Sequence, residues 1–157
     1  MRNLLVPVDL SDTSIAVVDR ANCLAQSFGS KLWLLHVFLP RHGPVPYNID
    51  RQFLRKEMAR EVVSRRHKLQ ELAERLRQDR VNVTVRSLAG NIPRIILSEA
   101  ERITADLIIL GSHGHGNLYH ALLGGVGQKV KRKARCPVML VPPPDYHPDS
   151  KIHSCMS

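Results

Sequence analysis

Five short apolar runs alternate along the sequence with four longer segments whose apolar residues recur at helical spacing. The runs are largely apolar at consecutive positions, which is typical of parallel strands that are covered on both faces. They lie at Asn3–Asp9, Lys31–Phe38, Val81–Ser87, Asp106–Leu110 and Cys136–Pro142. Because expected strands and helices alternate throughout, the pattern predicts one α/β domain with a doubly wound, five-stranded parallel sheet.

The segments between the runs carry the start and stop signals of helices. We expect helices over Thr13–Phe28, about Asp50–Asp79, a segment that opens at the Gly90–Pro93 turn, and Gln128–Arg135. Gly29 is expected to end the first helix, and Pro93 suits the first turn of the third. The second helix has apolar residues on one side, from Leu54 to Leu76. The run at Val81–Ser87 alternates with period two, so we place it nearer the sheet edge.

Two glycine clusters follow the fourth run, at 111–116 and 124–127. Glycine lets a ligand approach the backbone closely, and a strand, a glycine-rich loop and a helix N-terminus together form an anion site. In a doubly wound sheet, ligands bind outside the carboxyl ends of the strands. Those ends carry Pro7–Asp9, Val37, Ala89–Gly90 and the Gly111 loop. We expect one pocket that joins them, although neither the Rossmann nor the Walker glycine spacing is present.

Length and composition exclude several classes of protein. A chain of 157 residues that is 43% hydrophobic fits one globular domain. No apolar run approaches the roughly 20 residues that span a bilayer, and the first residues lack the features of a signal peptide. Three widely separated cysteines argue against a disulfide framework. We therefore expect a cytoplasmic protein with no membrane partner.

The formal net charge of +9 suits two kinds of anionic partner, a small ligand or nucleic acid. Much of the excess lies at Arg51–Arg80, where acidic and basic residues are interleaved, and at Lys129–Arg135, near a predicted helix C-terminus. Interleaved charges are typical of a solvated helix face, and no aromatic residues alternate with the cations to stack on bases. Nucleic-acid binding is therefore the less favoured interpretation.

The glycine spacing also matches a known signature. Gly111, Gly114, Gly124 and Gly125 form the pattern G-x2-G-x9-G-G, which resembles the nucleotide-binding signature G-x2-G-x9-G-[S/T] of the universal stress protein family. The opening LVPVDLS, the strand LLHV and the closing CPVMLVP also resemble family landmarks. The resemblance implies a universal stress protein domain over residues 1–142, with an adenine nucleotide α-hydrolase-like sheet of strand order 3-2-1-4-5. The polar, proline-rich tail at 143–157 is predicted to be disordered.

The resemblance further implies a small cytoplasmic stress-response protein that binds ATP or another adenine nucleotide, with Mg²⁺ as a companion of the phosphates. In nucleotide-binding members, ten matching positions surround the nucleotide: Pro7, Val8, Asp9, Val37, Gly111, His113, Gly114, Gly124, Gly125 and Val126. The acid at Asp9 is expected near the ribose and Val37 against adenine. Residues 111–114 are expected under the ribose and inner phosphates, and residues 124–126 offer backbone N–H groups to the outer phosphates.

One position departs from the family pattern. The Ser or Thr that follows the third glycine in the family is Gly125 here, so a hydroxyl donor to the terminal phosphates is missing. A hydrogen bond to a charged group is worth about 1.5–3 kcal/mol. We therefore expect ATP to bind about tenfold to a hundredfold more weakly than with the hydroxyl, so that ADP or AMP competes with it.

The sequence supports catalysis only weakly. The sequence has no Walker lysine and no acidic pair beside the expected site, so we name no catalytic residue and favour binding or sensing, with at most slow ATP hydrolysis. The alternative is an interaction protein with a degenerate site. Its basic surface would then bind a protein or nucleic-acid partner independently of nucleotide.

Several residues have a second interpretation. Asp9 also suits a carboxylate that only caps a helix. His113 and His115 form a single His-x-His without a further pair at ligand spacing, so we predict no metal site. His36 is expected to be a core histidine, and Cys23 a buried small hydrophobe.

The last apolar run predicts self-association. Val138–Val141 is apolar and would lie at a sheet edge. Pairing across a two-fold axis would cover that edge. We therefore expect a homodimer through this strand.

Overall fold

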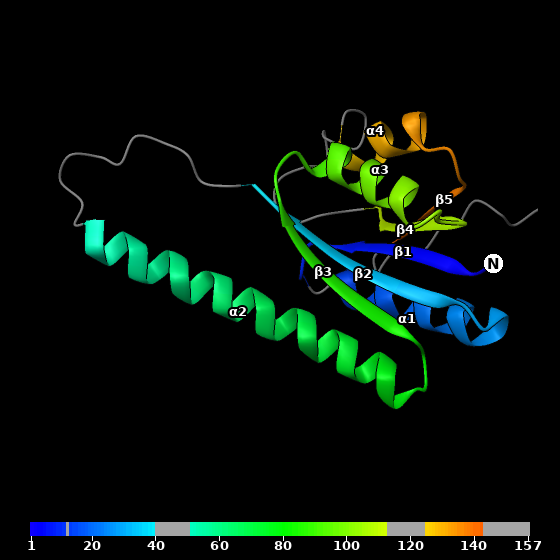
Figure 1. Ribbon diagram of the computed structural model, residues 1–157, viewed down its shortest axis with the longest axis horizontal. Coiled ribbons are helices and arrows are strands. Elements are labelled where there is room, and N and C mark those ends of the chain that lie inside the picture. Colours follow the sequence, from blue (N-terminus) through cyan, green and yellow to red (C-terminus); the bar gives the residue numbers. More distant parts are fainter. Residues whose placement is uncertain (12, 40–50, 113–124, 143–157) are drawn as a thin grey trace, which may run out of the picture.

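The computed structural model describes residues 1–11, 13–39, 51–112 and 125–142 of the chain. Its elements are β1 (Asn3–Val8), α1 (Thr13–Phe28), β2 (Lys31–Phe38), α2 (Arg51–Gln78), β3 (Val83–Ala89), α3 (Ile92–Arg102), β4 (Leu107–Gly111), α4 (Val126–Lys133) and β5 (Val138–Val141). The strands form one parallel sheet in the order β3-β2-β1-β4-β5 (Figure 1). The predicted doubly wound fold and its strand order are confirmed.

Helices cover both faces of the sheet, and successive residues of each strand point to opposite faces. On one face, Leu4, Leu32 and Leu34 pack into a core cluster with residues of α1 and α2. On the other face, Leu5 and Leu35 pack with residues of α3 and α4. All five leucines are at most 1% exposed. The central strands are therefore apolar at consecutive positions because each position faces a covered side.

The predicted helix ends are present. Gly29 adopts φ +60° after α1, and the N–H of Ser30 donates to a carbonyl five residues earlier at 2.9 Å, as in a Schellman ending. At the start of α3, the Asn91 side chain accepts a hydrogen bond from the Arg94 N–H at 3.2 Å, and Pro93 lies in the first turn. Both ends use the chemistry that the sequence indicates.

Two boundaries differ from the prediction. Helix α4 begins at Val126, two residues before the expected start, because the extended backbone of Gly125 provides the N-cap. Strand β3 covers Val83–Ala89 rather than 81–87, since it stays paired with β2 as far as Phe38. The predicted edge position of β3 is confirmed.

A buried carboxylate joins α3 to the β3 edge of the sheet. Glu99 is 7% exposed, and its two oxygens accept hydrogen bonds from Arg102 at 2.8 to 3.1 Å. The Nε of Arg86 on β3 lies 3.0 Å from the same carboxylate, although its N–H makes no hydrogen bond with the oxygen. Two cations therefore compensate the buried charge.

Helix α2 is longer than the sheet that it covers. Its 28 residues span about 42 Å, and its N-terminal half projects past the carboxyl ends of β2 and β3 (Figure 1). Leu69, Ala73 and Leu76 in its C-terminal half are at most 2% exposed, whereas Met58 and Val62 are 43% and 55% exposed. The apolar side of α2 therefore packs on the core along only part of its length.

Other expectations have mixed outcomes. Cys23 is exposed on α1, so the prediction that it is buried is wrong. None of the helices that the structure describes is long and apolar enough to cross a membrane. The tail at 143–157 lies outside the described residues, and so the domain limit at 142 stays a prediction.

Candidate functional site

Three neighbouring strands end at the same edge of the sheet. β1 ends at Val8, β2 at Phe38 and β4 at Gly111, and all three run parallel. The chain leaves β1 first toward β2 and β3, and later crosses to β4 and β5 on the other side. The strand order therefore reverses between β1 and β4, which is where ligands bind in doubly wound sheets.

The pairing of β1 is one-sided at this reversal. β1 pairs with β4 at Leu4 and Leu5, and this pairing stops before Pro7, whose nitrogen has no hydrogen to donate. On its other side, β1 stays paired with β2 as far as Val8. Among the described strands, β2 alone pairs with the carboxyl end of β1.

His36 supports that end of β1. Its ring is 5% exposed, and its Nδ1 lies 3.0 Å from the Val8 carbonyl oxygen. This contact requires a hydrogen on Nδ1, because a carbonyl can only accept. The buried Nε2 has no hydrogen-bond partner among the residues described. His36 is buried as predicted, but its contact with Val8 was missed because it follows from the β1–β2 register.

Asp9 is exposed directly after β1. Its Oδ1 accepts hydrogen bonds from the Ser11 N–H at 3.0 Å, the Ser11 hydroxyl at 2.5 Å and the Ser14 hydroxyl at 2.8 Å. Between these partners, Leu10 has a φ of +65°, which is uncommon for a residue other than glycine. The carboxylate therefore holds the loop before α1 through Ser11 and the Ser14 hydroxyl. None of these three hydrogen bonds comes from a backbone N–H of α1, so the capping interpretation stays a prediction.

Val8 and Val37 are nearly covered, and they face opposite sides of the sheet. Val8 is 6% exposed in the core cluster beneath α1 and α2. Val37 is 9% exposed in the cluster beneath α3 and α4, which also contains Leu110 of β4. The two side chains therefore cannot line one wall, and Val8 can contribute to a shared site through its backbone only.

Gly111 ends β4, and Gly125 opens α4. After Gly111, the Ser112 N–H donates to the Val141 carbonyl at 2.8 Å and continues the β4–β5 pairing. Gly125 has φ −72° and ψ −176°, an extended conformation that any residue adopts, and it makes no side-chain cap. Gly125 therefore offers no side chain to cap the first N–H groups of α4, and a helix N-terminus favours an anion.

Seven of the ten predicted site residues are described, at the carboxyl ends of β1, β2 and β4 or the start of α4: Pro7, Val8, Asp9, Val37, Gly111, Gly125 and Val126. His113, Gly114 and Gly124 lie outside the described residues, as does His115. In the part of the chain that the structure describes, no three His, Cys, Asp or Glu side chains gather as metal ligands. The individual roles of the ten residues stay predictions.

Comparisons with known proteins give one consistent family. The model of the universal stress protein family matches residues 1–142. Universal stress protein A homolog 1 of Coxiella burnetii is 29% identical over 149 residues, which cover 89% of this chain and 95% of that protein. The predicted family resemblance is therefore confirmed over residues 1–142, which include every described residue.

Solved structures agree with the sequence comparisons. The structure of MJ0577, a universal stress protein of Methanocaldococcus jannaschii, has a TM-score of 0.75 at 25% identity and covers 92% of this chain and 98% of that one. A universal stress protein in complex with cAMP has a TM-score of 0.68 at 23% identity and covers 89% of this chain and 95% of that one. Because the family model spans residues 1–142, this chain belongs to the universal stress protein family.

Proposed function

We propose that the chain binds an adenine nucleotide at the carboxyl edge of the sheet, near the reversal between β1 and β4, as a sensing or regulatory module of a cytoplasmic stress response. One observation carries the proposal: Asp9, Val37 and the start of α4 at Gly125 belong to segments that reach the same edge. A carboxylate, an aliphatic side chain and a helix N-terminus suit a ribose, a base and phosphates. The cAMP complex of a structural relative supports the same class of ligand.

Each segment has a proposed role. Asp9 would accept hydrogen bonds from the ribose hydroxyls while Oδ1 keeps its serine partners. Val37 would contact adenine, and Pro7 and Val8 would contribute backbone to the adenosine pocket. Residues 111–114 would pass under the ribose and inner phosphates, and residues 124–126 would donate backbone N–H groups to the outer phosphates.

In this proposal, Gly125 determines how strongly the site prefers ATP over ADP or AMP. Glycine leaves the start of α4 without a hydroxyl donor, so the outer phosphates of ATP gain little over those of ADP or AMP. Mg²⁺ would enter with the phosphates of ATP, since it commonly binds through substrate phosphates and water. At most slow hydrolysis is expected.

Thermal denaturation with millimolar ATP, ADP or AMP tests the proposal, together with mass spectrometry of small molecules released from the purified protein. A ligand at 100 times its Kd adds about 2.7 kcal/mol to the unfolding free energy, which raises the Tm by about 5–11 °C for a chain of this size. Gly114→Asp should abolish the shift, because it adds bulk and negative charge where the phosphates are expected. Ser98→Asp adds the same charge at an exposed position on α3 and should leave the shift intact. The proposal fails if none of the three nucleotides shifts the Tm.

We also propose that two copies pair through β5. This strand forms one edge of the sheet, and Leu140 on it is 38% exposed. Light scattering should give twice the mass of one chain, and Leu140→Lys should give a monomer because it buries a charge at the interface. Phe28→Lys, at an exposed position at the end of α1, should stay dimeric. A monomeric unmodified protein would exclude this pairing.

A second candidate function is nucleotide-independent binding of an acidic partner by α4. The observation that favours it is the exposed series Lys131, Arg132 and Lys133 at the end of that helix. Reversing all three charges to Glu should weaken the salt-dependent retention of the protein on heparin and leave the ATP shift intact. Unchanged retention would exclude α4 as the binding surface.

A further inference from the structure

The N-terminal half of α2 is a prominent surface that the proposed nucleotide site does not use. It projects past the carboxyl ends of β2 and β3 (Figure 1). Apolar side chains stay exposed along it, with 43% of Met58, 55% of Val62 and 67% of Val63 accessible. Helical spacing places Met58 and Val62 in line with Leu69, which is 2% exposed against the core. The apolar side of the helix thus continues beyond the part that the sheet covers.

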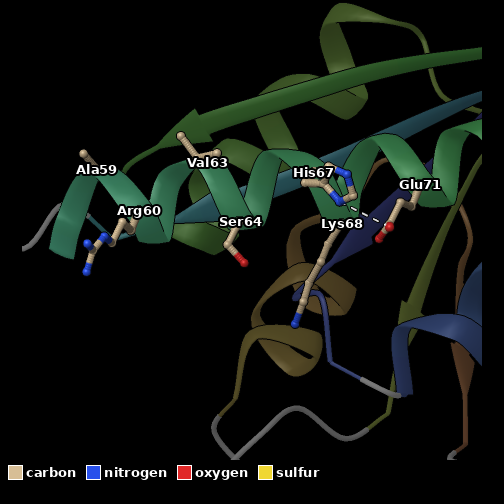
Figure 2. Close-up of a pocket in the computed structure, with 7 residues that line it drawn as sticks. All are labelled: Ala59, Arg60, Val63, Ser64, His67, Lys68 and Glu71. Atoms are coloured by element: carbon tan, nitrogen blue, oxygen red, sulfur yellow. Dashed lines mark ion pairs between the residues drawn. The ribbon is translucent and has the colours of Figure 1, made fainter. Parts of the chain in front are cut away.

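These three residues and Ala59, which is also exposed, form two adjacent rows on the helix. Met58 and Val62 are four residues apart, as are Ala59 and Val63, so each pair lies along one side of the helix. Figure 2 shows Ala59 and Val63 projecting from the same side of α2; both are among the lining residues of a pocket that extends along this helix to Glu71. Arg66 lies one turn after both valines. Together with one further cation they form what we call the docking face: Lys56, Met58, Ala59, Val62, Val63 and Arg66.

The part of α2 that carries the docking face is basic, and the face itself holds two cations, Lys56 and Arg66. Residues 51–68 contain seven Lys or Arg against two Glu. Both glutamates are already paired within the helix, Glu57 with Arg60 at 2.7 Å and Glu61 with Arg65. The two cations of the docking face make no ion pair with any residue that the structure describes. Exposed apolar area therefore coexists with uncompensated positive charge.

The charge and shape of the docking face argue against several kinds of binding partner. A second copy of the same helix would bring two basic segments together. A flat membrane cannot cover Met58, because the body of the protein packs on the same side of α2 at Leu69. Nucleic acid would leave the apolar rows without a partner, and residues 51–78 contain a single Phe and no Tyr or Trp to stack on bases. A slender, acidic and partly apolar partner fits the remaining requirements.

We propose that the docking face binds an acidic amphipathic helix of a partner protein, laid along α2. Packed helices lie about 8–10 Å apart, which lets apolar residues of the partner cover Met58, Val62 and Val63. Carboxylates beside that apolar row would pair with Lys56 and Arg66. The contact is about three turns long and smaller than a standard interface, so the affinity is expected to be micromolar. This inference does not depend on nucleotide binding.

The test uses a fluorescein-labelled synthetic peptide of about 20 residues, with Leu and Ala at positions i, i+3, i+4 and i+7 and Glu at most other positions. Fluorescence anisotropy should give saturable, micromolar binding to the full chain. Met58→Ser with Val62→Ser should weaken it at least about tenfold, and so should Lys56→Glu with Arg66→Glu. Arg20→Glu with Arg94→Glu makes the same charge change at exposed positions on α1 and α3, and should stay within about threefold.

Three results would overturn the inference. The first is no saturable binding of the peptide to a protein whose circular dichroism shows it to be folded. The second is equal binding of a scrambled peptide of the same composition, or equal loss in the α1 and α3 control variant, either of which reveals general charge attraction. The third is that the protein binds phosphatidylglycerol vesicles or a short DNA duplex more tightly than it binds the peptide, and that the Met58 and Val62 substitutions abolish this binding. That result would assign the face to a membrane or to nucleic acid.

Discussion

Gly125→Ser tests phosphate recognition by a gain of affinity, which is harder to mistake for misfolding than a loss. The φ and ψ of Gly125 are −72° and −176°, so serine enters without backbone strain. As the N-cap of α4, the introduced serine would place a hydroxyl at the start of the helix, where its oxygen can accept from a first-turn N–H. Its hydrogen then stays available for a phosphate oxygen.

The expected magnitude has two separable parts. Without nucleotide, serine is more stabilising than glycine at an N-cap by a few tenths of a kcal/mol, so the Tm should rise by only about 1 °C. With ATP, one hydroxyl bond to a charged phosphate contributes about 1.5–3 kcal/mol. The Kd for ATP should therefore fall about tenfold to a hundredfold. The Kd for AMP should change less, since AMP lacks the outer phosphates.

Isothermal titration calorimetry with ATP and AMP measures both effects. Gly125→Ala is the matched control, because it adds the same Cβ without a hydroxyl and should not tighten ATP binding. The reasoning is refuted if the serine and alanine variants change the Kd for ATP equally. It is also refuted if serine improves AMP as much as ATP, because the new contact would then lie away from the outer phosphates.

Three further substitutions test stability through urea denaturation. Glu99→Ala should cost about 2–3 kcal/mol, because it leaves Arg86 and Arg102 without their shared carboxylate, and the partial exposure of both cations reduces the loss. The pKa of Asp106 is held below its ordinary value by two backbone N–H groups at the start of the chain. Its contribution to stability is therefore present above about pH 4 and is lost as the pH falls through the folded-state pKa, so Asp106→Asn should lower the urea midpoint at pH 6 and flatten its fall in acid. His36→Phe should cost about 1–3 kcal/mol, because it removes the side-chain donor to the last carbonyl of β1.

Exposed ion pairs provide controls for the charge substitutions. Glu101 lies 3.4 Å from Arg135, and both side chains are largely exposed, so Glu101→Ala should change the unfolding free energy by less than about 1 kcal/mol. Asp19→Asn breaks a similar exposed pair with Arg75 on the surface of α1 and α2. It should leave the fall of the urea midpoint at acid pH unchanged. A loss at Glu101 equal to that at Glu99 would show that burial of Glu99 has no special effect.

The sheet could be predicted because its signals are local and agree with one another. The consecutive apolar residues of β1 and β2 require two covered faces, and alternation with helices then requires parallel strands. Gly29 and Pro93 mark a helix end and a helix start by their own backbone chemistry. Strand β3 could be placed toward the edge because its period-two pattern indicates less complete burial. None of these inferences needs a distance between residues far apart in the sequence.

The exposure of individual residues could not be predicted, because it depends on how far the sheet and the helices extend over one another. Helical periodicity shows that Met58 and Leu69 share a side of α2, but it does not show where the sheet beneath that side ends. Leu69 is buried and Met58 is exposed for that reason. Cys23 was mistaken for a core residue because cysteine has little polarity, whereas its position on α1 is exposed. In the candidate site, the opposite orientations of Val8 and Val37 follow from the strand register, which the sequence does not contain.

Asp9 would serve its loop and a ribose in one arrangement. Hydrogen bonds from Ser11 and Ser14 to its Oδ1 hold a loop in which Leu10 has a positive φ, a conformation that costs about 1 kcal/mol or more and persists where the surroundings compensate for it. The carboxylate is therefore positioned before any ligand arrives. A ribose that binds there would not need to order the side chain, so less of the interaction energy would be lost to conformational entropy. Holding the loop before α1 is thus the means by which Asp9 would be preorganised for a nucleotide.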